Sequence, residues 1–205
     1  MIESYLGTPG SGKSLHAAKD IVNALARGRL VITNFPVNTK GLKVHKNTRL
    51  IMLDNKSIKY SPSLIVCACD RYYEKYGVRK ALVVLDECQL LFDSRHWNDP
   101  GRDKWNWFFA QHRKICGINS TVLLITQNEK AVDKRIIPQS EYYVLHRKME
   151  YGSTFEFLLS MLFGFNLFLY KRIWRPGKET VQTSFFLGKK KLFNIYNTYM
   201  IFESK

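Results

Sequence analysis

A glycine-rich run near the start of the sequence has the residue types and the spacing to bind phosphate. The run is Gly7-Thr8-Pro9-Gly10-Ser11-Gly12-Lys13-Ser14, which fits the pattern G-x-x-x-x-G-K-[ST]. Glycines let several backbone N–H groups point at one anion, and the start of a following helix adds positive partial charge. Lys13 would then contact the β- and γ-phosphates of a nucleotide, and Ser14 would ligate Mg²⁺. An ordinary glycine-rich turn is the alternative, but an apolar run precedes these residues and helix-forming residues follow them, as the phosphate-binding motif requires.

Two carboxylates follow an apolar run further along the chain. Residues 81–85 (ALVVL) are continuously apolar, which is typical of a parallel strand covered on both faces, and Asp86 and Glu87 come next. A hydrolytic site needs one carboxylate for the metal and another for the nucleophile. Asp86 would hold Mg²⁺ through water, and Glu87 would orient and polarise the attacking water. We expect this strand to lie beside the strand that precedes the glycine-rich run.

Gln127 stands at the end of another apolar run, residues 120–126 (STVLLIT). An amide at this place can contact the γ-phosphate or the attacking water, whereas a polar strand end without a function is the alternative. Open α/β sheets bind their ligands at the carboxyl edge of the strands. The strand ends are therefore expected to meet in one site that binds ATP and Mg²⁺.

The remaining elements alternate between strand and helix. Gly77 and Gly117 are placed to end two of the helices. Alternation of this kind implies right-handed crossovers, so the sequence predicts a three-layer α/β fold of the P-loop NTPase type with a mostly parallel sheet. The predicted strands are residues 2–6, 30–33, 49–53, 81–85 and 120–126, and the predicted helices are residues 14–26, 63–76 and 103–116.

Residues 151–205 break this alternation and are predicted to form a small C-terminal lobe, in the same domain as an ATPase core of residues 1–150. Residues 171–186 predict two strands about a turn at Arg175-Pro176-Gly177, and residues 191–202 predict a terminal helix. The run 157–170 is densely apolar, but as a helix it would span about 21 Å, short of the roughly 30 Å of a bilayer core. We expect it to be a buried strand or helix, and a membrane-dipping or subunit-facing segment is the alternative.

Charge and composition narrow the class of protein. The 205-residue chain is 45% hydrophobic and 24% charged, which excludes a disordered or fibrous chain. Its net charge of +15 favours a polyanionic partner, either nucleic acid or an anionic membrane surface. The four cysteines lack zinc-like spacing and no signal peptide opens the chain, so we expect a cytosolic protein with reduced thiols. The aromatic residues at 97, 105, 107, 108 and 109 are expected to pack in the core, with stacking on single-stranded DNA as the alternative.

Several longer runs resemble one family. The chain is similar to the gene I assembly proteins of filamentous bacteriophages, which belong with the zonular occludens toxin (Zot) N-terminal domain family. Asn197 departs from this pattern, because an aspartate is expected there. The similar runs cover most of the chain and are Leu82 to Cys88, Ser94 to Asp99, His112-Arg113-Lys114, Val132-Asp133-Lys134 and Tyr196-Asn197-Thr198.

The resemblance implies a function. It implies the cytoplasmic ATPase part of a bacterial inner-membrane protein that drives phage assembly and extrusion, without the membrane-spanning and periplasmic parts. Its partners would be the phage coat protein and the single-stranded-DNA-binding protein that the coat protein replaces. A nucleotide-switched scaffold that binds a membrane or a partner, without sustained turnover, is the alternative.

The family's ATPase core is similar to hexameric motors that translocate DNA, which implies a homo-oligomeric ring. An arginine supplied by a neighbouring subunit can add about 10³- to 10⁵-fold to the rate of phosphoryl transfer. Arg113, late on the helix 103–116, is the first candidate for this role, and Arg135 is the second. A surface salt bridge of little energetic weight is the alternative for either residue.

Overall fold

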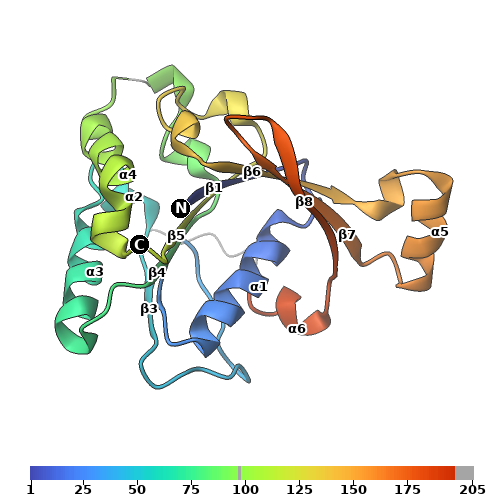
Figure 1. Ribbon diagram of the computed structural model, residues 1–205, viewed down its shortest axis with the longest axis horizontal. Coiled ribbons are helices and arrows are strands. Elements are labelled where there is room, and N and C mark those ends of the chain that lie inside the picture. Colours follow the sequence, from blue (N-terminus) through green and yellow to red (C-terminus); the bar gives the residue numbers. More distant parts are fainter. Residues whose placement is uncertain (97, 197–205) are drawn as a thin grey trace.

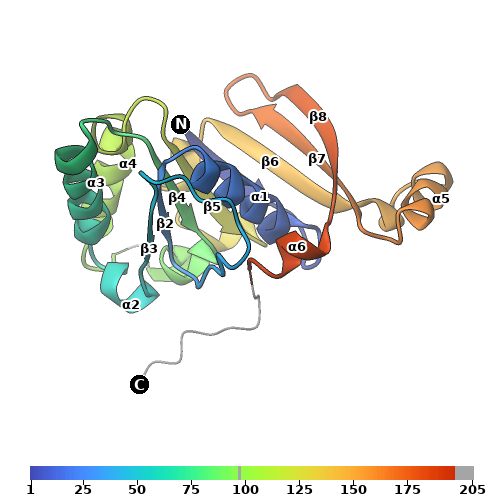
Figure 2. The same ribbon diagram turned by 90° about the horizontal axis from the view of Figure 1, so that it is seen from below.

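The computed structural model describes residues 1–96 and 98–196, and within them one eight-stranded sheet has helices on both faces (Figures 1 and 2). The strand order is β3-β2-β4-β5-β1-β6-β7-β8; the first six are parallel to one another, and β7 is antiparallel to both of its neighbours, β6 and β8. The predicted α/β class and mostly parallel sheet are confirmed.

The strands are β1 (Ile2–Leu6), β2 (Leu30–Thr33), β3 (Arg49–Met52), β4 (Ala81–Leu85), β5 (Thr121–Thr126), β6 (Tyr142–Lys148), β7 (Leu167–Trp174) and β8 (Glu179–Leu187). The α-helices are α1 (Lys13–Ala26), α2 (Asn55–Ile58), α3 (Ser63–Tyr76), α4 (Arg102–Cys116), α5 (Thr154–Leu162) and α6 (Lys190–Phe193). Short 3₁₀ helices lie at Cys88–Leu90, Ser94–His96, Glu129–Ala131, Ile137–Gln139 and Met149–Tyr151.

The core forms two layers, one on each face of the central strands. All of β4 is buried, and because side chains alternate along a strand, Val83 and Leu85 join the layer under α3 and α4 while Leu82 and Val84 join the layer under α1. The aromatic residues of α4 confirm the expectation of core packing, with one exception. Trp107 is exposed, and residue 97 lies outside the described residues. Trp105, Phe108 and Phe109 are fully buried in the first layer.

The sheet order corrects one expectation. The strand that ends in Asp86 was expected beside β1, but β5 lies between β4 and β1. This order places the end of β5, and with it Gln127, between the ends of β1 and β4.

The C-terminal part extends the same sheet. The predicted pair of strands is confirmed as β7 and β8, and β7 pairs with β6, which the sequence interpretation did not assign. The terminal helix predicted over 191–202 is wrong for residues 194–196: α6 ends at Phe193, and Tyr196 instead forms a bridge with Val37. The rest of that prediction lies outside the described residues, and the division of the chain at residue 150 stays a prediction.

The apolar run 157–170 is only partly buried, so the expectation of a buried segment is wrong for its first half. Leu167–Tyr170 opens β7 and is buried. Before it, α5 projects from the end of the sheet with most of its apolar side chains exposed (Figure 2). Within residues 1–96 and 98–196, none of the helices combines the length and the hydropathy needed to cross a bilayer.

Candidate nucleotide-binding site

The glycine-rich loop joins β1 to α1 and is closed by its own lysine. Lys13 Nζ donates hydrogen bonds to the carbonyl oxygens of Gly7 and Thr8, over 2.7 and 2.9 Å. Gly12 has a φ of 93°, and a Cβ at this position would stand 2.6 Å from the ring of Phe168, so only glycine fits there without a shift. The Ser11 Oγ is buried in the loop without a hydrogen-bond partner among the described residues. A loop with an orphaned hydroxyl and a tethered ammonium is suited to receive phosphate oxygens.

Ser14 and Asp86 form an oxygen pair at the start of α1. The Ser14 Oγ lies 3.5 Å from Asp86 Oδ2, although 72 residues separate them in sequence. The side chain of Asn34 holds the backbone of Asp86 in place, accepting from its N–H and donating to its carbonyl oxygen. Hydroxyl and carboxylate oxygens are the protein ligands that Mg²⁺ prefers, so the pair fits the predicted metal.

Burial changes the protonation energetics of the two charged groups in this part of the site. It raises the pKa of the Asp86 carboxyl, an effect that hydrogen bonds from Tyr196 and from the Glu87 amide oppose. It lowers the pKa of the Lys13 ammonium, against the attraction of the Asp86 and Glu87 carboxylates. Each charge is therefore partly desolvated, and a phosphate or a cation that arrived would interact with it more strongly than in bulk water.

The Glu87 carboxylate accepts hydrogen bonds from two side-chain amides. Gln127 Nε2 donates to its Oε1 over 2.8 Å, and Gln89 Nε2 donates to Oε2. Thr126 in turn donates to the Gln89 side chain, so the end of β5 orients both amides. Glu87 itself has a φ of 46°, an uncommon conformation for a residue with a side chain, which turns the carboxylate out from the end of β4. The structure thus brings together the carboxylates and the glutamine that the sequence interpretation placed in one site.

Tyr196 is a part of this site that sequence reasoning missed. Its hydroxyl donates to Asp86 Oδ2, the same oxygen that faces Ser14. The ring packs edge-on against Phe35, and with α6 it leaves a cavity of about 170 Å³ over the glycine-rich loop. Tyr196 does open one of the runs that resemble the family, but its role depends on a contact across 110 residues.

The Tyr196 contact predicts that its hydroxyl competes with the metal. For Mg²⁺ to be held by Asp86, the hydrogen bond from Tyr196 must be broken or shared, so Tyr196→Phe is expected to tighten Mg²⁺-dependent nucleotide binding by about three- to tenfold. Titration of Mg·ADP against both proteins, repeated with EDTA, measures this. Weaker Mg·ADP binding in the variant would mean that the hydroxyl supports the bound state instead.

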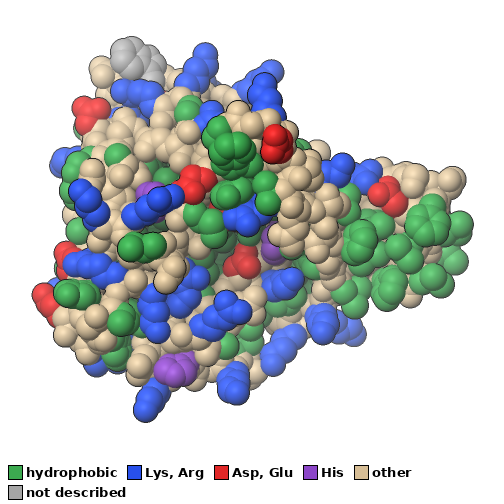
Figure 3. Space-filling model, viewed as in Figure 1, with side chains coloured by type: hydrophobic (Ala, Val, Ile, Leu, Met, Phe, Trp, Pro, Cys, Tyr) green, Lys and Arg blue, Asp and Glu red, His purple; other side chains and the backbone are tan. Residues whose placement is uncertain are grey.

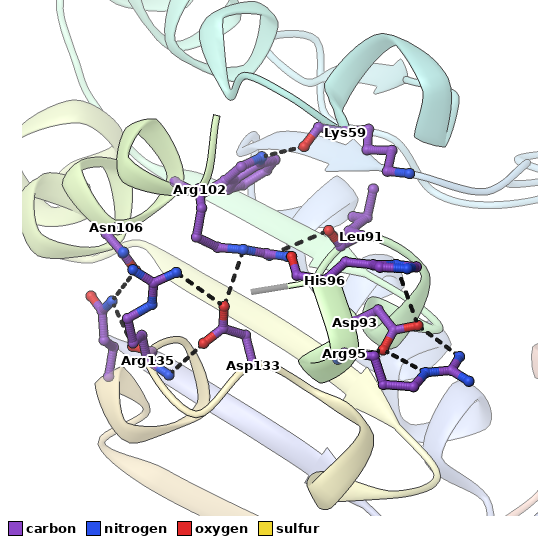
Figure 4. A network of polar contacts seen from close by, with 11 residues as sticks. Lys59, Leu91, Asp93, Arg95, His96, Arg102, Asn106, Asp133 and Arg135 are labelled. Carbon is purple, nitrogen blue, oxygen red and sulfur yellow. Dashed lines mark hydrogen bonds and ion pairs between the residues drawn. The ribbon is translucent and has the colours of Figure 1, made fainter. Parts of the chain in front are cut away.

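The loop after β5 is braced by a buried ion pair (Figure 4). Arg102 Nε lies 3.1 Å from Asp133 Oδ2, and both side chains are less than 5% exposed. Asp133 also accepts from the Arg135 backbone N–H and faces its guanidinium at 3.6 Å. The bridge between Asp93 and Val132 joins this loop to the residue that directly precedes the family-like run starting at Ser94. These contacts fix the loop that follows Gln127, with the half-exposed Arg135 on it.

Arg113 lies away from the other predicted site residues. It stands near the end of α4, which runs back to the amino edge of the sheet, and its guanidinium pairs with Glu141 over 2.8 Å. Both partners are partly exposed and close to the amino group of Met1. Within one chain Arg113 therefore does not reach the glycine-rich loop, and a role in a neighbour's site stays a prediction.

A buried pair of imidazoles supports α1 behind the loop. His16 Nδ1 and His146 Nε2 are 2.8 Å apart, and His146 Nδ1 lies 2.9 Å from the carbonyl oxygen of Val144. Because Nδ1 of His146 must donate to that carbonyl, its Nε2 accepts, and His16 is the donor. Burial lowers the pKa of His16 to about 2 and that of His146 to about 4, so both rings are neutral at physiological pH. The pair joins α1 to β6 without placing positive charge behind the phosphate loop.

Comparison with known proteins agrees with this geometry. The chain is 27% identical over 214 residues to the "Gene 1 protein" of Enterobacteria phage M13, covering 97% of this chain and 59% of that protein, so it spans about three fifths of the relative's length. The fold is similar to the N-terminal domain of zonular occludens toxin from Neisseria meningitidis, with a TM-score of 0.55 at 20% identity over 96% of this chain and 98% of that one. It is also similar to the genome packaging NTPase B204 of Sulfolobus turreted icosahedral virus 2, with a TM-score of 0.54 at 14% identity over 90% and 95% of the two chains.

The two solved structures confirm the P-loop NTPase fold. The family model described as "Zonular occludens toxin (Zot)" matches residues 1–164, which is four fifths of the sequence. The match includes the glycine-rich loop, both carboxylates and Gln127, as the resemblance in the sequence predicts. The chain belongs to the zonular occludens toxin (Zot) family.

Proposed function

We propose that this chain is the ATP-hydrolysing cytoplasmic motor domain of a machine that assembles and extrudes filamentous phage at the bacterial inner membrane. The observation that supports it most is the meeting of the Lys13–Ser14 loop, the Asp86–Glu87 pair and Gln127 at one edge of the sheet, in a chain of this family. The likeness to the gene 1 protein of phage M13 supports the setting in phage assembly.

The residues of the site have separable tasks in this proposal. The loop N–H groups and Lys13 bind the β- and γ-phosphates, and Ser14 and Asp86 hold Mg²⁺. The metal supplies charge neutralisation at the phosphate oxygens. Glu87 accepts the proton of the attacking water while Gln127 and Gln89 fix its carboxylate in one orientation. Because Gln127 contacts Glu87, the loop after β5 is in a position to respond to the presence of the γ-phosphate.

The proposal includes a ring of like subunits, since Lys13 and one Mg²⁺ offset only part of the charge that develops on the transferred phosphoryl group. Arg113 remains the first candidate to act on a neighbour's nucleotide, and Arg135 remains the second. Arg135 lies on the loop after β5, near the edge that holds Glu87, whereas Arg113 lies at the opposite edge. The proposed partners of the ring are the coat protein, a single-stranded-DNA-binding protein, single-stranded DNA itself and the anionic inner membrane.

Mixing of inactive subunits tests whether an arginine acts in trans. Arg113→Ala and Lys13→Ala chains are each expected to hydrolyse little ATP alone. Mixed in equal amounts, they should recover about a quarter or more of the wild-type rate, because some intact loops then face an intact arginine. The same experiment with Arg135→Ala distinguishes the two candidates. If neither mixture regains activity at concentrations where the chains associate, the ring mechanism is contradicted.

A further inference from the structure

The first observation is an exposed apolar projection, the α5 knob, formed by Phe155, Phe157, Leu158, Met161, Leu162 and Phe163. Each of these side chains is between 44% and 79% exposed. In Figure 3, viewed as Figure 1 is, apolar side chains gather over the end of the molecule that α5 forms. Large contiguous apolar patches are rare on monomeric soluble proteins and mark surfaces that bind a partner.

The knob is a folded element and does not depend on a partner for its shape. Ser153 and Glu156 form a reciprocal capping box at the start of α5, which satisfies its first backbone N–H groups. Glu156 is also paired with Arg147 of β6 over 2.7 Å. At its other end, Gly164 and Phe165 both have positive φ and turn the chain back into β7. A preformed helix loses little conformational freedom when it docks.

The second observation is a groove between α3 and α4 with apolar walls. The α3–α4 groove has a volume of about 750 Å³ and is open to solvent. Its walls include Pro62, Val66, Cys67 and Trp107, and the indole of Trp107 is 54% exposed. Exposed tryptophans in grooves are frequent anchors of protein interfaces. The charged residues that line it are Asp70, Arg71, Glu74, Asp103 and Lys104.

Knob and groove lie at opposite ends of the longest axis of the molecule, so they cannot meet within one chain (Figures 1 and 2). We propose that the α5 knob of one copy docks in the α3–α4 groove of the next. A contact between two different patches of the same chain is heterologous, and repetition of it closes a ring or extends a filament. Each copy then offers one knob and one groove, as a homo-oligomeric ring requires.

The distribution of charge favours a second copy of the chain, and not an anionic lipid surface, as the partner of the α5 knob. The groove is lined by three carboxylates and two cations, and one of the carboxylates, Asp70, is already paired with Arg79 over 2.7 Å. The groove therefore carries no net positive charge, in a chain of net charge +15, and repels a second copy less than the rest of the surface does. At the base of the knob, Lys148 and Arg147 are already paired with Glu150 and Glu156, which weakens any attraction to anionic lipid. A lipid surface would also leave the groove and its exposed tryptophan without an occupant.

The inference gives the proposed ring its interface, and so rests on the proposed function only for the expectation of a ring. Its test does not use ATP hydrolysis. A chain that hydrolyses ATP but does not join knob to groove would overturn this inference and leave the proposed function standing, whereas loss of hydrolysis in a chain that does join them would do the reverse.

Cysteine cross-linking tests the contact directly, because Cys67 is exposed in the groove and the other three cysteines are buried. In a Leu158→Cys chain, mild oxidation is expected to give a ladder of disulfide-linked dimers, trimers and larger species, since each chain has one cysteine in the knob and one in the groove. Leu158→Cys combined with Cys67→Ser is the matched control. A disulfide needs Cα atoms about 4.4–6.8 Å apart, so only a direct contact gives it efficiently. If oxidation of the Leu158→Cys chain gives dimers and no larger species, a head-to-tail contact is contradicted, whether or not the control chain also forms those dimers.

Association measured by sedimentation gives a second readout that does not depend on cysteine chemistry. Leu158→Glu puts a charge into the docked knob and is expected to weaken self-association by about tenfold or more. Phe185→Glu changes an equally exposed apolar residue on β8 and should leave it within about twofold. Flotation with phosphatidylglycerol vesicles distinguishes the membrane alternative. If Leu158→Glu abolishes vesicle binding but leaves self-association unchanged, the knob binds lipid and the inference is wrong.

Discussion

Lys13→Ala is expected to abolish nucleotide binding while the fold stays intact. The ammonium that would offset phosphate charge is removed, and so are the two hydrogen bonds that tether the loop to Gly7 and Thr8. Charge-assisted hydrogen bonds contribute about 1.5–3 kcal/mol each, so we expect the affinity for Mg·ATP to fall about 100-fold or more. Titration with a fluorescent ATP analogue measures the loss, and thermal unfolding checks the fold.

Lys19→Ala is the matched control for this variant. Lys19 lies on the same helix, six residues further along and outside the loop, and its removal changes the net charge equally. It should leave the affinity for Mg·ATP within about twofold. Unchanged affinity in a folded Lys13→Ala chain would contradict the assignment of the glycine-rich loop as a phosphate site.

Glu87→Gln is expected to separate binding from hydrolysis. The glutamine keeps an oxygen that can accept the hydrogen bond from Gln127, but it cannot take a proton from water. Binding of Mg·ATP should stay within about threefold of wild type, and the rate of hydrolysis should fall by about 10²- to 10⁴-fold. Equilibrium binding and single-turnover phosphate release measure the two effects separately.

Two variants sharpen this result. Glu129→Gln alters an exposed carboxylate two residues after Gln127 and should hydrolyse ATP at the wild-type rate. Asp86→Asn should first weaken the dependence on Mg²⁺, because Asp86 faces Ser14 and not the amides around Glu87. Turnover at the wild-type rate in Glu87→Gln would remove Glu87 from the role of base.

The glycine-rich loop and the carboxylate pair could be predicted from the sequence, because each consists of a few consecutive residues. The glycine-rich run needs only its own glycines and the start of α1, and Asp86 and Glu87 follow a strand that is apolar throughout. The order of the strands could not be predicted this way. Whether β4 or β5 lies next to β1 depends on long-range pairing, and the intervening β5 is what brings Gln127 within 2.8 Å of Glu87.

Three misses have a common physical origin in long-range context. The β6 strand opens with a short apolar run, Tyr142 to Leu145, which was a usable signal, but it is half-exposed and ends in three polar residues, His146, Arg147 and Lys148. Tyr196 reaches Asp86 only because the chain folds back over the loop. For α5, apolar composition indicates a surface that favours removal from water, but it does not say whether the same chain or a partner covers it.

Steady-state phosphate release by the wild-type chain tests the central claim most directly. With excess ATP and Mg²⁺, the account predicts many phosphates released per chain, at a rate per chain that rises with protein concentration as subunits assemble, and none above background when EDTA removes the metal. A single burst of no more than one phosphate per chain, unaffected by concentration, would contradict the motor and identify a nucleotide-switched scaffold instead.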